Sequence, residues 1–245
     1  MEKEKTLSRN GFFHLFVAII FLLAPFGNLF IESIGLIIAS VVLSVIGLIW
    51  FFGLFIVQPN QTRVLIFFGK YAGTVRGNGF FWLNPFYTKK KVSLRVRNLE
   101  TEVIKVNDEQ GNPILISAVI VWKVVDTYKA VFDIETAEEV NAKTGIRELK
   151  PEVSYQNFVK IQAESALRKI AHSYPYDIMD DEKENVMCLR SGVDEINQEL
   201  AIEVKNRLAI VGIEVIEARI SNLSYAPEIA AIMLQRQQAQ AIISA

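Results

Sequence analysis

The feature that most constrains this chain is a long uncharged segment near its N-terminus. None of the 24 residues of Ile34–Val57 carries a charge, and Glu32 is the only Asp, Glu, Lys or Arg between Phe12 and Val57. About 20 consecutive apolar residues cross the hydrocarbon core of a bilayer. A cleavable signal peptide is the alternative, but no small-x-small cleavage site follows the first apolar run and the second run is too long. We therefore predict a membrane anchor over residues 1–57.

The first apolar run, residues 12–31, is interrupted near Pro25 and Gly27. Two topologies follow. The favoured one is a transmembrane helical hairpin of segments 12–31 and 34–57, with a turn near Glu32. The other is a re-entrant arm, in which neighbouring groups satisfy the backbone that Pro and Gly free. Lysine and arginine precede the first segment and follow the second, so both ends are predicted to be cytoplasmic.

A block of positive charge follows the anchor. Residues 58–97 carry eight basic side chains and no Asp or Glu, although the whole chain has 26 Lys and Arg against 27 Asp and Glu. Each Lys or Arg close to an anionic membrane contributes about 1 kcal/mol of attraction. A nucleic-acid surface is the competing interpretation, and the adjoining anchor disfavours it. We predict that this basic block faces anionic lipid headgroups.

An aromatic segment, Phe80–Tyr87, lies inside the basic block. Aromatic rings favour the membrane interface, but they also fill domain cores, and both can hold for different residues of this segment. The predicted membrane-contacting set combines the two kinds of side chain: Arg63, Lys70, Arg76, Phe80, Phe81, Trp82, Phe86, Tyr87, Lys89, Lys90 and Lys91.

Strand signals dominate the first half of the region after the anchor. Residues Thr62–Phe68 are β-branched and aromatic and predict a strand. Alternation over residues 92–103, with a phase shift near Asn98, predicts one half-buried strand with a bulge. Turn residues at 108–113, followed by apolar residues 114–125, predict a strand pair whose second member is buried on both faces.

Helical periodicity dominates the second half. Apolar residues three or four positions apart predict a helix from Tyr155 to about His172 and another over Val193–Leu208 that stops at Gly212. Residues 213–222 return to a strand pattern. The mixture of segments predicts an α+β fold.

A last helix is predicted from Pro227 and Glu228, which are favourable in a first turn, to Ala245. No stop signal ends this helix, so we expect the native chain to continue. Its apolar seam approximates a heptad pattern for just over two repeats, short of what identifies a coiled coil by itself. The seam supplies the predicted oligomerisation residues: Ile229, Ile232, Arg236, Ala239 and Ile243.

Residue patterns that carry catalysis or bind metals are nearly absent. His14 and His172 have no His or Cys at ligand spacing, and Cys188 is the only cysteine. The glycines between Gly69 and Gly79 match neither a P-loop nor a dinucleotide-binding spacing. We therefore predict that the protein is not an enzyme, that it has no catalytic residues, metal site or cofactor, and that nucleic acid is not its partner.

The order of the motifs resembles one known family. The anchor is followed by QPNQTRV (58–64) and GNGFFWLNPF (77–86), then by the turn and long apolar strand of 108–126, and later by AESALR (163–168), PEI (227–229) and RQQAQA (236–241). From residue 58 to the end, the chain resembles the SPFH, or Band 7, superfamily of stomatins, prohibitins and flotillins.

The resemblance implies an SPFH domain over 58–225 and the start of a C-terminal coiled-coil helix over 226–245. It also implies a non-enzymatic scaffold that oligomerises into rings or cages on the cytoplasmic face of a membrane, which we expect to be a bacterial inner membrane. Its partners would be the lipid bilayer, further copies of the chain, and a membrane protein such as a membrane-anchored protease. The alternative is a membrane-anchored adaptor or ligand-binding module that acts as a monomer or dimer.

Overall fold

The computed structural model describes residues 11–27, 34–134, 138–140, 147–149, 151–177 and 187–243. The chain forms two compact units, of which the first ends at Arg95 and the second begins at Val96. Both α-helices and antiparallel β-strands are present, which confirms the predicted α+β class.

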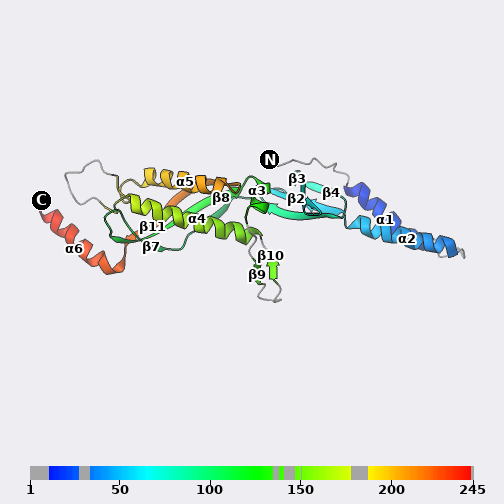
Figure 1. Ribbon diagram of the computed structural model, residues 1–245, viewed down its shortest axis with the longest axis horizontal. Coiled ribbons are helices and arrows are strands. Elements are labelled where there is room, and N and C mark those ends of the chain that lie inside the picture. The colour runs from blue at the N-terminus through cyan, green and yellow to red at the C-terminus, as the bar shows by residue number, and fades with distance from the viewer. Residues whose placement is uncertain are drawn as a thin grey trace. The chain divides into compact units, whose positions relative to one another are not determined.

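Two apolar helices begin the first unit, α1 (Gly11–Gly27) and α2 (Ile34–Phe51), and they lie side by side (Figure 1). Ser44 Oγ donates a hydrogen bond to the Phe21 carbonyl at 3.1 Å. A Cβ added to Gly47 would lie 2.7 Å from Phe21 Cβ, so small residues allow the close approach. Helix α2 is long and apolar enough to cross a membrane, whereas α1 is shorter. The predicted turn near Glu32 lies outside the described residues.

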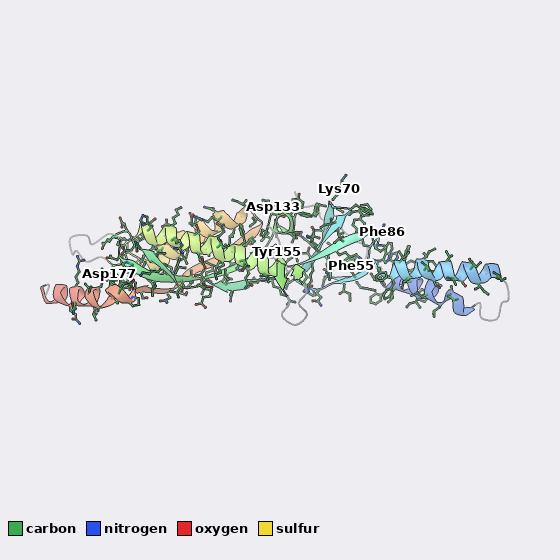
Figure 2. The ribbon with its side chains drawn as sticks, turned by 60° about the horizontal axis from the view of Figure 1, so that its bottom comes forward. Phe55, Lys70, Phe86, Asp133, Tyr155 and Asp177 are labelled. Carbon is green, nitrogen blue, oxygen red and sulfur yellow. The ribbon has the colours of Figure 1, made fainter. Side chains whose placement is uncertain are left out.

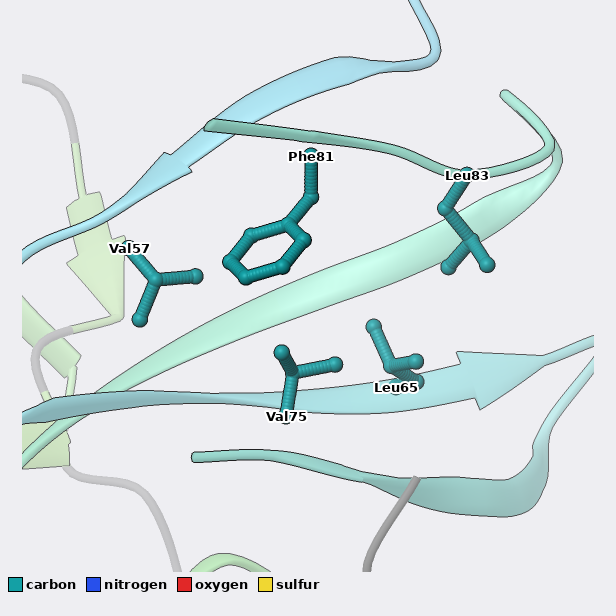
Figure 3. Close-up of a cluster of buried hydrophobic side chains, with 5 residues drawn as sticks. All are labelled: Val57, Leu65, Val75, Phe81 and Leu83. Carbon is teal, nitrogen blue, oxygen red and sulfur yellow. The ribbon is translucent and has the colours of Figure 1, made fainter. Parts of the chain in front are cut away.

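Five strands complete the first unit. They are β1 (Leu54–Val57), β2 (Gln61–Phe67), β3 (Lys70–Val75), β4 (Gly79–Trp82) and β5 (Tyr87–Ser93). Strand β1 pairs with β4, and β3, β2 and β5 form a second sheet in that order. Between them lies a core of Val57, Leu65, Val75, Phe81 and Leu83, in which the Phe81 ring points toward Val57 and Val75 (Figure 3).

The second apolar segment differs from its prediction at one end. We expected it to run from Ile34 to Val57, but the helix ends at Phe51 and Leu54–Val57 form β1. Pairing with β4 satisfies the backbone of these four residues, and Val57 is buried in the core.

The second unit is built on an antiparallel sheet of β6 (Arg97–Glu100), β7 (Ile104–Asn107), β8 (Pro113–Val124) and β11 (Ile213–Tyr225). Strand β11 pairs with one edge of β8, while β6 and β7 pair with successive parts of β8. The predicted pair joined by a turn is confirmed, because Asn107 faces Pro113 across β7 and β8. Trp122 and the isoleucines of β8 are fully buried.

The single bulged strand predicted over residues 92–103 is wrong. Strand β5 ends at Ser93 in the first unit, and β6 begins at Arg97 in the second. The ladder then breaks between β6 and β7, where Thr101 N donates to Ala118 O and Thr101 Oγ1 accepts from Ala118 N. A side-chain hydroxyl thus replaces a ladder partner at the interruption.

Helices α4 (Pro151–Ser173) and α5 (Val193–Ala209) cover the sheet of the second unit (Figure 1). The buried stripe of α5 is Ile196, Leu200, Val204 and Leu208, as its periodicity predicts, while Val193 is exposed. Arg207 of α5 donates to Ser165 of α4 at 2.7 Å and so joins the two helices. The remaining elements are α3 (Thr127–Phe132), the β9 (Glu138–Val140) and β10 (Arg147–Leu149) pair, and α6 (Pro227–Ile243).

Candidate membrane-contact site

Helix α2 joins the β part of the first unit through a very short connection. Only Phe52 and Gly53 separate the end of α2 from the start of β1. The Gly53 carbonyl accepts a hydrogen bond from Leu83 N at 3.0 Å. A Cβ on Gly53 would come within 2.5 Å of Leu83 O and of Trp82 Nε1. The helix end and the chain that leaves β4 are therefore in backbone contact, and a glycine makes this contact possible.

Three stacked rings reinforce this junction. The centroids of Trp50 and Trp82 lie 4.3 Å apart, and His14 stacks on Trp82 at 4.5 Å. Trp82 Nε1 also donates to the Trp50 carbonyl at 2.9 Å. Stacked aromatic pairs contribute about 0.5–1.5 kcal/mol beyond their burial. The stack joins α1, α2 and β4, so Trp82, which we predicted to contact lipid, binds the protein's own helices.

Lys89 also belongs to the junction. Its Nζ donates to the carbonyls of Phe52 and Gly53 at 3.1 and 3.2 Å, and it lies 5.0 Å from the centroid of the Phe55 ring. A cation just beyond the C-terminus of a helix is favoured by the helix dipole. Burial lowers the pKa of Lys89 below 10.5, and the charge of Arg63 lowers it further. These bonds place the Lys89 ammonium at the end of α2, and its contact with headgroups stays a prediction.

Replacing Lys89 with glutamine is expected to lower the free energy of unfolding by about 1 kcal/mol, because two carbonyls lose a charged donor. Since the pKa of Lys89 is lower in the folded state, the unfolded chain binds more protons as the pH approaches 10.5 from below. The contribution of Lys89 to stability therefore rises with pH in that window, and the variant should lose this dependence. Thermal unfolding in detergent at several pH values measures both effects.

The matched control for this prediction is Lys90→Gln. Lys90 is the next residue on β5, pairs with Val64, and points to the opposite face of the sheet. We expect this variant to change stability by less than about 0.5 kcal/mol. Equal losses in the two variants would show that the bonds of Lys89 at the helix end contribute nothing specific.

Arg63 and Lys91 lie directly opposite each other on β2 and β5, so their side chains share a face. Arg63 Nη2 donates to the Ile56 carbonyl at 3.3 Å, while Arg63 Nε is buried without a hydrogen-bond partner. Burial lowers the pKa of Arg63. Lys70 and Arg76 are exposed at the start of β3 and just beyond its end. The predicted basic set thus divides by position. Arg63, Lys89 and Lys91 lie on one face of the sheet, where Lys91 is exposed and the other two are half-buried, and the remaining three are Lys70, Arg76 and Lys90.

The aromatic segment also divides. Phe81 is 3% exposed and lies in the core, which corrects its predicted contact with lipid. Phe80 is half-buried, with its ring 5.2 Å from that of Phe12 on α1. Phe86, by contrast, is 64% exposed. Alternation along β4 explains the difference between Phe80 and Phe81, because successive side chains of a strand point to opposite faces, whereas Phe86 lies in the turn before β5.

Two aromatic residues of this surface were missed by sequence reasoning. Phe67 is the last residue of β2, and Phe68 lies in the turn that follows. Phe68 is 79% exposed and has a positive φ of 44°, a backbone conformation that is costly for a bulky residue. Their rings contact each other and the rings of Tyr87 and Phe86. Phe86 lies at the end of the β part from which the helices extend (Figure 2). We call Phe67, Phe68 and Phe86 the exposed aromatic group. The sequence signal that could have identified it is the pair of adjacent phenylalanines before the turn residue Gly69.

A sequence model of the SPFH domain / Band 7 family matches residues 55–245, from β1 to the end of the chain. The chain belongs to this family. No curated protein matches the sequence. Band 7 proteins are membrane-associated and generally non-enzymatic scaffolds, and a helix capable of crossing a membrane immediately precedes the Band 7 match here.

The last helix of the Band 7 region, α6, carries the predicted oligomerisation residues. Ile229 is half-buried, whereas Ile232 and Arg236 are exposed. Met233, which was not predicted, is buried and lies one turn after Ile229 on the same side of the helix. The side chains of Ala239 and Ile243 lie outside the described residues.

The two histidines and the cysteine of this Band 7 protein lie in different parts of the fold. His14 lies in the aromatic stack, His172 is exposed at the end of α4, and Cys188 is buried against Ser191. Within the described part of the chain, no group of His, Cys, Asp and Glu could hold a metal ion.

Proposed function

We propose that the protein is a non-enzymatic membrane scaffold. Helices α1 and α2 form a transmembrane hairpin, and the Band 7 domain lies on the cytoplasmic face. Copies assemble into rings or cages that organise a membrane microdomain and regulate partner membrane proteins, such as a membrane-anchored protease.

The observation that carries this proposal is the junction between α2 and the β part of the first unit. The Gly53 contact, the Trp50 and Trp82 stack, and the two hydrogen bonds of Lys89 all join the helix end to the β strands. The β part of the first unit, joined in this way, does not move on a flexible tether. It is held at a fixed depth relative to α2, as a scaffold that shapes a membrane patch requires.

The charge and the aromatic residues of the first unit support the membrane orientation. Phe86 of the exposed aromatic group lies at the end of the β part that adjoins α2, and the ring of Phe68 stacks near that of Phe86 (Figure 2). Among the described residues of this unit, 11–27 and 34–95, none is Asp or Glu. Aromatic rings are favoured at headgroup level on either side of a membrane, and an excess of positive charge is favoured on the cytoplasmic side.

Two surfaces of the second unit support assembly. On α6, Ile232 and Leu234 are 64% and 56% exposed. Strand β11 lies at one edge of its sheet, two register shifts interrupt its pairing with β8, and Asn197 of α5 accepts a hydrogen bond from Ile220 N on this strand. An edge strand and an exposed apolar helix are the kinds of surface that a further copy covers.

Imaging of the full-length protein in a mild detergent tests the proposal. We expect large closed particles of uniform size, with the subunit number given by their mass. Monomers or dimers at all protein concentrations would contradict the scaffold and favour the membrane-anchored adaptor or ligand-binding module. The observation that favours a ligand-binding module as the second candidate is the cavity between the end of α2 and Arg63.

A further inference from the structure

A cavity of about 440 Å³ opens within the first unit, beside the end of α2. One wall is apolar and includes Phe51 of α2, Ile56 of β1 and Phe80 of β4. The other wall is formed by polar side chains of β2 and β5, among them Arg63 and Lys91. Cavities of this volume hold small molecules or parts of larger ones. This cavity is amphipathic, because apolar side chains line one wall and polar side chains line the other.

The polar wall has an uncompensated positive charge. Arg63 and Lys91 are directly opposed on neighbouring strands, and Lys89 lies on the same face of the sheet. Arg63 Nε is buried without a hydrogen-bond partner. Because none of the described residues of the unit is Asp or Glu, no carboxylate among them can neutralise these cations. A buried donor of a charged group is costly unless it is paired, so Arg63 Nε calls for an anion from outside the unit, and the exposed Lys91 lies opposite Arg63 to share it.

The apolar wall restricts what kind of anion fits. Ile56 is 59% exposed and Phe51 46% exposed, and both lie next to the end of the helix that crosses the bilayer in our proposal. A small hydrophilic anion would leave these side chains in contact with water. An anion that carries apolar chains would cover them and continue along the exposed apolar surface of α2.

We propose that this cavity binds the headgroup of one anionic phospholipid per subunit, with its phosphate on Arg63 and Lys91 and the first carbons of its chains against Phe51, Ile56 and Phe80. The inference rests on the membrane orientation of the proposed function and deepens it. The remaining basic residues attract the bilayer diffusely, whereas this site selects a single lipid.

Native mass spectrometry of the full-length protein in detergent tests the site. The purified protein, freed of lipid, is titrated with dioleoyl phosphatidylglycerol, and we expect saturation at one lipid per subunit. Lys91→Gln should weaken this binding about tenfold, which is the loss of one charge-assisted hydrogen bond. Lys90→Gln removes the same charge from the neighbouring residue on the other face and should change it less than about twofold.

Two further measurements complete the test. One compares binding of the lipid with binding of a free anion, and the other compares the contribution of the apolar wall with that of the charged residues. Glycerol phosphate, which has the headgroup chemistry without the chains, should not be retained, and zwitterionic phosphatidylcholine should bind without saturation. Ile56→Ser leaves every charge in place and should weaken phosphatidylglycerol binding about fivefold. Retention of glycerol phosphate as tight as that of the lipid would overturn the role of the chains.

The inference fails if Lys91→Gln and Lys90→Gln weaken binding equally, because the attraction would then be diffuse. The particle size, measured on the same samples, tests the proposed scaffold function independently of the lipid site. Large particles with no difference between the two variants leave the scaffold standing without the lipid site. Monomers that still distinguish the two variants leave the lipid site standing without the scaffold.

Discussion

Replacing Gly53 with alanine is expected to lower the free energy of unfolding of the first unit by about 3 kcal/mol. The added Cβ would lie 2.5 Å from the Leu83 carbonyl oxygen and from Trp82 Nε1, distances at which something must move. Moving Trp82 disturbs its stack on Trp50 and its hydrogen bond to the Trp50 carbonyl. Moving Leu83 shifts a core residue. The strain therefore spreads into all contacts that hold the helix end.

Tryptophan fluorescence during thermal unfolding in detergent measures this effect, because the two stacked indoles report on the junction. The matched control is Gly35→Ala, at the other end of α2, where an added Cβ meets nothing within 4 Å. Alanine favours a helix over glycine by about 1 kcal/mol, so the control should be neutral or stabilising. A Gly53→Ala variant as stable as this control would show that α2 and β4 are not in the close contact described above.

Ile232→Glu is expected to convert the large particles into small species without unfolding the subunit. Ile232 is 64% exposed on α6, so the folded single chain tolerates a charge there. Burying an isoleucine between subunits contributes about 1.5–3 kcal/mol, and a buried unpaired carboxylate reverses that gain. Because every subunit of a ring repeats the same contact, the loss is multiplied around the assembly.

Mass measurement of particles in mild detergent checks this prediction, and Gln235→Glu is its control. Gln235 is exposed on the same helix and receives the same charge at a polar position. We expect the control to assemble as the unmodified chain does. Particles of unchanged size in the Ile232→Glu variant would remove α6 from the assembly surface, and the edge of β11 would be the remaining candidate.

The elements that could be predicted from the sequence are those whose signal is local. The apolar run at 114–125 became the central strand β8, but its burial alternates, so that one face is fully buried and the predicted burial on both faces is wrong. The periodic stripe of α5 is buried from Ile196 to Leu208, because the pattern of this segment already specifies its buried face. Membership of the Band 7 family was likewise visible in short motifs, and the match over residues 55–245 confirms it.

The residues that escaped prediction depend on partners far away in the chain. Leu54–Val57 continue an apolar run, and only pairing with β4 makes them a strand. Lys89, Lys90 and Lys91 are chemically identical, yet the register of β5 against β2 places Lys89 at the helix end and Lys90 on the opposite face. Composition cannot separate such neighbours, because their roles are set by the strand alternation and by what covers each face.

The two-residue connection between α2 and β1 has a mechanical consequence. A helix of 18 residues is about 27 Å long, slightly less than the roughly 30 Å hydrocarbon core of a typical bilayer. Most spanning helices respond to such a mismatch independently of their soluble domains, because a linker absorbs the movement. Here the linker consists only of Phe52 and Gly53, which is too short to absorb the movement. Trp82 and Lys89 also donate hydrogen bonds to backbone carbonyls at the helix end. With α2 crossing the bilayer as proposed, local thinning or thickening of the lipid would displace the attached sheet directly, so that the domain works as a gauge of membrane thickness.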